Sequence, residues 1–298
     1  MGRPLGQSLN NFGLRIFFRL ASICPGAMRW LKRPFVRIAF AASPTVRKNT
    51  GDNARVIFGD SITPAETRRF GRGVLGYFFD FVLDISYCQR ATRQQLAKRI
   101  AGIEGHDRYV ATRQARRGAI LLTAHMGSFE LGIVALQEFE SHIHVVFKRD
   151  AIGGFETLRG NMRQRLGVHE APIDDGWPIW VRLRDSLRND DVVLVQGDRV
   201  MPGQRGIAVP FLHGRLMLPT GPVKLAAASG APIVAVFCVR DPDGRVRLHI
   251  DEAIHVPEQL TEEAMIGAMS KIAGVLERYV RQHPQQWLVL NSAFCEHS

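Results

Sequence analysis

The stretch ILLTAHMGSFELGIVALQEF, residues 120–139, predicts an apolar strand that gives way to a helix, with His125 at the junction and Glu130 five positions later. An apolar run of this kind suits a strand that is buried on both faces of a parallel sheet. The helix is expected to begin near Ser128, which can cap it. Its apolar stripe consists of Leu131, Val134, Ala135 and Phe139. In open α/β sheets ligands bind beyond the carboxyl ends of the strands, which is where His125 stands.

The rest of the chain from residue 118 onward alternates between short apolar runs and helical patterns. The predicted strands are residues 119–124, 143–148, 191–196, 232–239 and 246–251. The predicted helices are residues 128–139, 154–166, 178–188, 221–229 and 262–282. This alternation predicts an α/β fold with a largely parallel central sheet flanked by helices.

Two further helices are expected upstream of this region. Thr63, Pro64 and Glu66 form a capping-box pattern that starts a long and very apolar helix, which should be buried or face lipid. The pattern in residues 91–105 predicts a second helix that ends near Gly102 or Gly105.

Positive charge is concentrated at the start of the chain. Lys and Arg number 39 against 28 acidic residues, which gives a net charge of +11, and residues 1–51 contain no Asp or Glu. Basic side chains there alternate with large apolar ones, which is typical of a segment lying on a membrane surface. Pro25 and Pro34 are expected to break it into short pieces. We therefore predict a helical, basic, amphipathic membrane-associating segment over residues 1–50 and one catalytic domain over residues 51–298; the alternative is an ordinary helical extension packed on the main domain.

The cysteines and histidines favour a metal-free protein in a reducing, cytosol-facing environment. Four cysteines lie far apart without a CxxC pair, so neither a disulfide framework nor a zinc site is indicated. His142 and His144 share one side of a predicted strand, but no third metal ligand accompanies them. No run of about 18 apolar residues predicts a membrane span, and no secretory signal pattern is present.

The spacing of His125 and Glu130 is a weak signal until its context is considered. Acidic residues are 28 of 298, so ten histidines should give roughly one such pair by chance. A second pair, His169 and Asp174, does occur, but it lies in a predicted loop that contains Pro172. The first pair is the better candidate because a buried strand and a helix hold it in place.

The chemistry that this pair suits is removal of a proton from a hydroxyl that attacks an acyl carbonyl. His125 would be the general base, and Glu130 would orient the imidazole and stabilise its protonated form. No G-x-S-x-G elbow is present, so a serine hydrolase is not supported and direct transfer is simpler than an acyl-enzyme. The alternative is a buried, hydrogen-bonded histidine at the end of a strand.

Several stretches resemble one family when taken in order. AHMGSFELG resembles the H-x4-D/E signature of the glycerolipid and lysophospholipid acyltransferase superfamily, and within it the branch of bacterial lipid A lauroyl/myristoyl acyltransferases and phosphatidylinositol mannoside acyltransferases. Six more stretches are similar to that branch, between roughly residues 45 and 294: VRKNTGDNARVIFGD, VVFKRD, FETLRGNMRQRLGV, VVLVQGDRV, AVPFLHGRLMLPTGPVKLAAASGAPIVAVF and HPQQWLVLNSAF.

The resemblance implies transfer of a fatty acyl group from acyl carrier protein or acyl-CoA to a hydroxyl of a membrane glycolipid or phospholipid, with no resident cofactor. It gives His125 the role of the base and Glu130 that of its partner. Arg163 would bind or orient substrate, with Arg159 and Arg165 competing for that alignment. Asp198 and Arg199 are expected beside the pair at the same edge of the sheet. The residues implied for the acceptor and acyl pocket are Pro210, Phe211, Thr220, Gly221 and Pro222.

The expected location is the cytoplasmic face of a bacterial inner membrane, with peripheral or weak attachment to an anionic surface. Members of the lipid A branch usually begin with a hydrophobic membrane segment, whereas this region is shorter, basic and interrupted by prolines. Two rival functions compete with the enzyme. A non-catalytic lipid-binding protein on the same scaffold is disfavoured by the presence of both His125 and Glu130. A nucleic-acid-binding protein is disfavoured because no groove-reading or strand-binding module is recognisable.

Overall fold

Seven strands form one mixed sheet in the computed structural model, which describes residues 25–149, 153–201 and 203–294. They are β1 (Ile100–Glu104), β2 (Ala119–Thr123), β3 (Ile143–Phe147), β4 (His169–Pro172), β5 (Val192–Gln196), β8 (Ile233–Arg240) and β9 (Val246–Ile254). Their spatial order is β1-β9-β8-β2-β5-β3-β4, and each neighbouring pair is parallel except β8 with β9. The predicted α/β fold with a largely parallel sheet is thereby confirmed.

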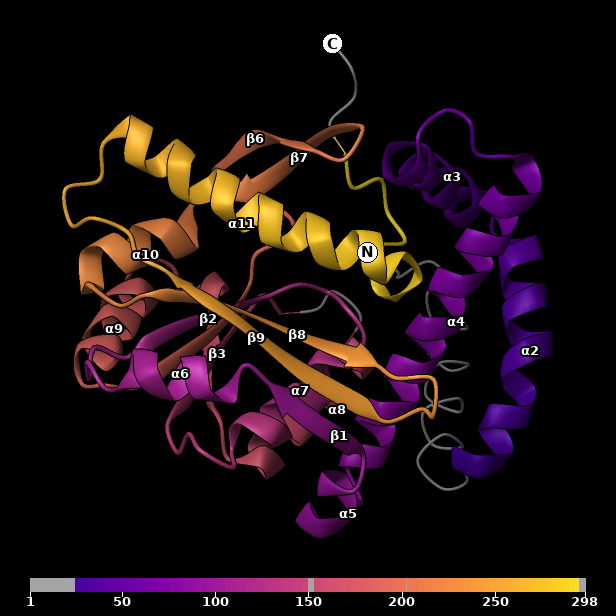
Figure 1. The fold of residues 1–298 in the computed structure, drawn as a ribbon. Helices are drawn as coiled ribbons and strands as arrows, with labels where there is room; N and C mark the ends of the chain where they lie inside the picture. Colours follow the sequence, from indigo (N-terminus) through magenta and orange to yellow (C-terminus); the bar gives the residue numbers. More distant parts are fainter. Residues whose placement is uncertain (1–24, 150–152, 202, 295–298) are drawn as a thin grey trace, which may run out of the picture.

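Helices cover both faces of this sheet (Figure 1). One face carries α9 (Trp177–Arg188), α10 (Gly221–Ser229), α11 (Glu262–Gln282) and the hairpin of β6 (Gly206–Phe211) with β7 (Gly214–Pro219). The other carries α5 (Arg93–Ala97), α6 (His106–Arg113), α7 (Phe129–Leu136) and α8 (Gly153–Leu166). Ile120 and Leu122 of β2 point to the first layer, and Ala119 and Leu121 to the second. The strand is apolar throughout because both of its faces are buried.

The N-terminal helices pack along one side of this core (Figure 1). They are α2 (Pro25–Ala42), α3 (Pro44–Phe58) and α4 (Pro64–Cys88). The capping box at Thr63 and Glu66 is confirmed, and α4 contributes to the core on both sheet faces. The predicted break at Pro34 is wrong, since this residue lies inside α2. The predicted boundary between residues 50 and 51 falls within α3. In the described part of the chain, no helix is both long and apolar enough for a membrane span.

Two local predictions are wrong at the edges of the sheet. The helix expected over residues 91–105 is limited to α5, and Ile100–Glu104 forms β1 against β9. His169–Pro172, expected in a loop, forms the edge strand β4 against β3. In both cases pairing with a distant strand outweighs the local preference of the sequence.

A tight turn joins β2 to α7 and carries His125. Its backbone is held by strands and loops that are far away in sequence: Gly127 N–H donates to Gln286 O over 2.8 Å, and Ser128 N–H donates to Cys238 O over 3.2 Å. Gly127 has a φ of +56°, and a Cβ atom there would stand 1.9 Å from the carbonyl oxygen of Cys238. The turn therefore requires glycine for its dihedral angle and for its close approach to β8.

Replacing Gly127 with Ala should destabilise the protein by about 2–4 kcal/mol, because a strained φ and an overpacked backbone contact act together. Gly244 is the matched control, since it also has a positive φ of +87° but nothing within 4 Å of a Cβ atom. Gly244→Ala should cost about 1 kcal/mol. Urea unfolding measures both variants, and equal losses would contradict the steric role of the Cys238 carbonyl.

Candidate active site

His125 and Asp198 meet at the carboxyl edge of the sheet. Each follows the end of a strand, β2 for His125 and β5 for Asp198, and these strands are parallel neighbours with Thr123 opposite Gln196. Nδ1 of His125 lies 2.8 Å from Oδ1 of Asp198, and the backbone N–H of His125 donates to Oδ2 over 3.2 Å. The sequence predicted that Asp198 would lie beside His125, and the structure places the two side chains in direct contact.

The Asp198 carboxylate is fully enclosed and well supplied with donors. Its side chain has no exposed surface, and the indole Nε1–H of Trp287 donates to Oδ2 over 2.9 Å. Burial by itself would raise the pKa of this carboxyl. The charge of His125, its hydrogen bond, Arg199 and the Trp287 N–H outweigh burial and hold the pKa far below its usual range. Asp198 is therefore an anion at neutral pH.

This anion fixes the tautomer of His125. A carboxylate only accepts hydrogen bonds, so Nδ1 of a neutral His125 carries the proton and Nε2 keeps a lone pair. The side chain is 18% exposed, and within the described residues Nε2 has no hydrogen-bond partner. Burial lowers the pKa of His125 against the opposing effect of Asp198, and the charges of Arg199 and Arg159 lower it further. The imidazole is therefore neutral at pH 7, with a free acceptor nitrogen.

The predicted contact between Glu130 and His125 is not what the structure shows. Glu130 lies in the first turn of α7, and its Oε1 accepts from Nε of Arg159 over 2.8 Å. Both side chains are largely enclosed, at 2% and 12% exposure. The direction of α7 carries this carboxylate toward α8, whereas Asp198 reaches His125 directly. Glu130 thus holds an arginine near the imidazole, and Asp198 orients the imidazole.

Arg159, not Arg163, is the arginine of α8 that lies near His125. Arg163 is 1% exposed and donates to Glu156 over 2.6 Å and to Glu170 over 2.7 Å. Its guanidinium carbon also stands 3.8 Å from the centroid of the Phe147 ring. These contacts commit Arg163 to the packing of α8 against β3 and β4. Its Nη1 is buried without a hydrogen-bond partner among the described residues, so a substrate-binding role for Arg163 stays a prediction. Of the two arginines, Arg159 is the one whose charge acts on His125. Arg165 donates to the backbone carbonyls of Gln89 and Ala91.

Arg199 supplies a second positive charge to the site. It follows Asp198 directly and lowers the pKa of both Asp198 and His125. Its Nε is buried and has no hydrogen-bond partner among the described residues. A buried donor without a partner is unfavourable, so this guanidinium is suited to receive oxygen atoms of a bound molecule.

The remaining predicted substrate-binding residues differ in burial, since Phe211 and Thr220 are buried whereas Pro210 is exposed. Phe211 is 1% exposed, and its ring centroid lies 5.9 Å from that of Trp287, so it supports the indole that contacts Asp198. Pro210 is exposed on β6. Thr220 bonds to the carbonyl of Arg205, and Gly221 begins α10 with Trp180 close by. Their contribution to a pocket stays a prediction.

One buried polar cluster was missed by sequence reasoning. Asp84 of α4 is 3% exposed and accepts from Ser128 Oγ, Arg240 and Arg99. The Ser128 hydroxyl therefore bonds Asp84 and does not cap α7, although the residue stands at the N-cap position. The available signal was an acid inside the very apolar segment GVLGYFFDFVLDI, because such a charge needs a partner. This cluster braces the turn that carries His125.

The described residues contain no group of three or more His, Cys, Asp or Glu side chains placed to hold a metal ion. His144 pairs with Asp191 at 2.9 Å and stacks on His169 at 4.8 Å between ring centroids. The second motif pair does not meet either, since Asp174 accepts from the backbone N–H of Arg149. The arrangement at His125 would suit a general base, because a buried carboxylate orients a neutral imidazole and two guanidinium groups lie near it.

Comparison with known proteins points to acyltransferases. A family model described as bacterial lipid A biosynthesis acyltransferase matches residues 11–295. Phosphatidylinositol mannoside acyltransferase from Mycobacterium tuberculosis (strain ATCC 25618 / H37Rv) is 27% identical over 150 residues, which cover 50% of this chain and 46% of the relative. The protein of the same name from Mycolicibacterium smegmatis (strain ATCC 700084 / mc(2)155) is 25% identical over 179 residues, covering 59% and 56%. The chain thus spans about half the length of the curated relatives it matches.

One solved structure is similar over most of the chain. It is the 1-acyl-sn-glycerophosphate (LPA) acyltransferase PlsC from Thermotoga maritima, with a TM-score of 0.38 and 14% identity, covering 92% of this chain and 98% of that one.

Nuclear magnetic resonance titration of the His125 ring nitrogens tests which carboxylate orients the imidazole. Asp198→Asn removes the negative charge and one of the two acceptor oxygens, so the pKa of His125 should fall further below its ordinary value. Glu130→Gln is the matched control and should lower the pKa by less, because Glu130 acts on the ring only through Arg159. An equal or larger shift with Glu130→Gln would restore the original assignment of Glu130.

Proposed function

Because the chain belongs to the bacterial lipid A biosynthesis acyltransferase family, we propose that it moves a fatty acyl group from acyl carrier protein or acyl-CoA to a hydroxyl of a membrane glycolipid or phospholipid. The observation that carries this proposal is the contact of 2.8 Å between His125 Nδ1 and the buried carboxylate of Asp198. It leaves Nε2 as the acceptor for a proton from the lipid hydroxyl. The acyl group arrives on its donor, so the proposed reaction needs no resident cofactor.

The proposed reaction is a direct transfer. Nε2 of His125 takes the hydroxyl proton while the lipid oxygen forms a bond to the thioester carbonyl carbon. The tetrahedral intermediate then breaks its carbon–sulfur bond, and the thiolate leaves and recovers the proton from His125. Asp198 stabilises the transient imidazolium and stays ionised throughout. The products are the acylated lipid and the free thiol of acyl carrier protein or coenzyme A.

Two guanidinium groups suit the negative charge that develops in this reaction. Arg159 and Arg199 both lie near enough to His125 to lower its pKa. In the proposal they stabilise the oxyanion on the thioester oxygen, or hold a phosphate of the lipid or the donor, because preorganised charges of this kind lower the barrier. Glu130 then acts in the site by fixing Arg159, through the bond of 2.8 Å between them.

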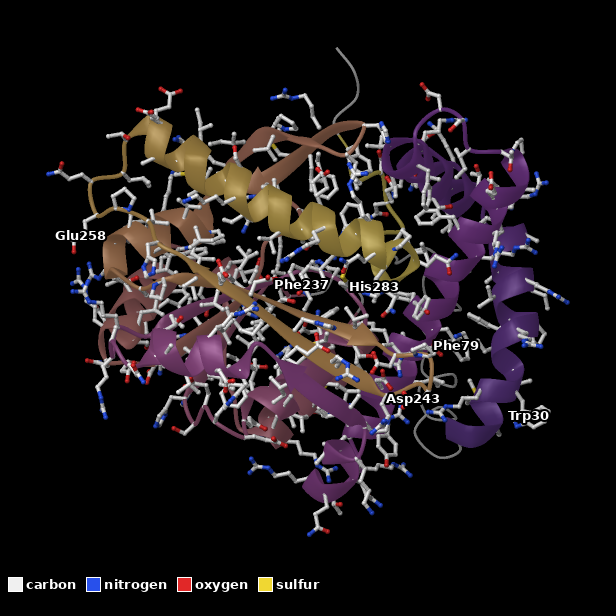
Figure 2. All side chains as sticks on the ribbon, viewed as in Figure 1. Trp30, Phe79, Phe237, Asp243, Glu258 and His283 are labelled. Carbon is white, nitrogen blue, oxygen red and sulfur yellow. The ribbon has the colours of Figure 1, made fainter. Side chains whose placement is uncertain are left out.

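The outer face of α2 supports a peripheral position on an anionic membrane. Trp30, Leu31, Phe35 and Ile38 are exposed, at 88%, 53%, 42% and 69%. Figure 2 shows Trp30 projecting from α2 away from the rest of the molecule, whereas Phe79 lies on the α4 side of the helix pair. The proposed location is the cytoplasmic face of a bacterial inner membrane.

Basic side chains line this apolar face. Arg29, Arg33 and Arg37 recur every four residues, so they form an exposed stripe beside the apolar one. Apolar side chains that enter the acyl region and arginines that contact phosphates are the two parts of an interfacial helix. The opposite stripe, with Met28, Val36 and Phe40, is buried against α4. The helix therefore has one face for the protein and one for lipid.

His125→Ala should lower acyl transfer by at least about a hundredfold, because the general base is lost. The measurement is thiol release from palmitoyl-coenzyme A with a bacterial lipid extract as acceptor, together with analysis of the acylated lipid. His169→Ala is the control, because His169 is an exposed histidine at the start of the edge strand β4. Transfer that persists in His125→Ala at the wild-type rate would refute the proposed function.

Replacing Trp30 and Ile38 together with Ser should weaken binding to vesicles that contain phosphatidylglycerol by at least about tenfold, since each apolar side chain contributes about 1.5–3 kcal/mol when buried. Trp177→Ser is the matched control, because Trp177 is 76% exposed on α9, on the other side of the molecule. Flotation with and without the anionic lipid measures binding, and a gel shift with duplex DNA tests the nucleic-acid alternative. Unchanged flotation of the double variant would exclude α2 as the contact.

A further inference from the structure

Asn53 is a buried amide of α3 that bonds only to the backbone of a distant segment. It is 2% exposed. Its Nδ2 donates to Val289 O over 3.3 Å and to Asn291 O over 2.9 Å, and its Oδ1 accepts from Ala293 N–H over 3.0 Å. One amide side chain therefore satisfies three backbone groups of a segment that follows it by about 240 positions. These three backbone groups lie within residues 287–293, which are called the 287–293 segment below.

The other end of the 287–293 segment touches both members of the His125–Asp198 pair. Trp287 donates its indole N–H to Asp198, and the N–H of the next residue, Leu288, donates to the carbonyl oxygen of His125 over 2.6 Å. Two consecutive residues thus position the carboxylate and the imidazole. Both are buried, at 2% exposure for Trp287 and 6% for Leu288.

The 287–293 segment has little regular structure of its own. Besides the bond from Leu288 to His125, an isolated bridge between Trp287 and Met126 links it to the turn, and the bridge between Phe294 and Leu216 lies just beyond it. Trp287, Leu288 and Val289 are buried in the core, and the backbone groups of the segment depend on individual hydrogen bonds because no helix or strand ladder pairs them. A second side chain of α3 also bonds to the segment: Asn49 donates to Leu290 O over 3.1 Å.

We propose that Asn53 is a positioning residue for the catalytic pair, acting through the 287–293 segment on Trp287 and Leu288. This inference rests on the proposed function, because it assigns Asn53 a part in placing the proposed base. If the amide is lost, three buried backbone groups lose their partners and the segment must move to satisfy them. A shift of the indole and of the Leu288 N–H then alters the distance between Nδ1 and Oδ1, and small displacements of reacting groups are costly in rate.

Asn53→Asp is the sharpest variant. It keeps the shape and the oxygen that accepts from Ala293, but it replaces the Nδ2 donor with a second acceptor facing two carbonyl oxygens. Under the assay of thiol release from palmitoyl-coenzyme A with bacterial lipid extract, kcat should fall by about tenfold or more while KM stays within about twofold. Asn53→Ser removes the same donors without adding a charge and should give the same pattern if Asn53→Asp does not fold.

Thr50→Val is the matched control on the same helix. Thr50 is also buried, at 1% exposure, but its hydroxyl bonds to Val46 O within α3 and not to the 287–293 segment. This variant perturbs the packing of α3 without touching the segment, and kcat should stay within about twofold of the wild type. A loss equal to that of the Asn53 variants would show a general packing effect and overturn the proposal.

The pH dependence and a double-mutant cycle separate positioning from lost stability. A longer contact with Asp198 weakens the effect that raises the His125 pKa, so the acid limb of kcat/KM should move to lower pH in the Asn53 variants. Trp287→Phe removes the indole donor, and its effect on kcat should be less than multiplicative with that of Asn53→Ser. A folded Asn53 variant with a wild-type kcat and acid limb, or independent effects in the cycle, overturns the inference.

Failure of this inference is distinguishable from failure of the proposed function. Nuclear magnetic resonance titration of His125 needs no substrate, and the Asn53 variants should lower its pKa whatever the acceptor lipid is. If His125→Ala abolishes transfer and the Asn53 variants leave both kcat and the His125 pKa unchanged, the positioning role alone is wrong. If His125→Ala transfers as the wild type does, the enzymatic assignment itself is wrong.

Discussion

The contact between the His125 imidazole and the buried Asp198 carboxylate is the interaction on which the site depends. An enclosed anion is costly unless donors and positive charge surround it. Here the donors are the ring, the backbone N–H of His125 and the Trp287 indole, with Arg199 close by. The two residues follow parallel neighbouring strands, so the sheet order brings together groups that are 73 positions apart. A different pairing of β2 would leave the imidazole without its partner.

The sequence predicted most of the sheet and the place of His125, because both follow from local patterns. Strands buried on both faces are mostly apolar, and β2, β3, β5 and β8 have this pattern. β9 is less uniform, because polar residues such as Arg247 and Glu252 lie among its apolar ones. The edge strands β1 and β4 were missed because partly exposed edge strands lack that pattern and form through pairing with β9 and β3. For His125 the sequence favoured Glu130, a neighbour in the chain. The partner in space is Asp198, and no local signal ranks a distant carboxylate above a near one.

The two arginines of α8 illustrate the same limit. Arg159 and Arg163 are one helical turn apart, so periodicity places both on a similar side of the helix. Their ion-pair partners differ because those partners lie on other elements: Glu130 of α7 bonds Arg159, and Glu170 of β4 bonds Arg163. The role expected for Arg163 came from a resemblance between sequences, and such a resemblance does not show which acidic residues surround a side chain in the fold.

The helices before residue 60 belong physically to the same unit as the site. The predicted boundary at residues 50 and 51 lies inside α3, and Ala54 and Ile57 of this helix are part of the main core. Asn53, on the same helix, reaches the 287–293 segment and through it the His125–Asp198 pair. Only Ser43 separates α3 from α2, whose outer face carries Trp30 and the arginine stripe. The surface proposed to meet lipid and the base proposed to act on it are thus joined by one short path of helices and hydrogen bonds. An independent membrane anchor would need a flexible linker between the two, and the packing of α2 and α3 on α4 leaves no place for one between residues 25 and 58.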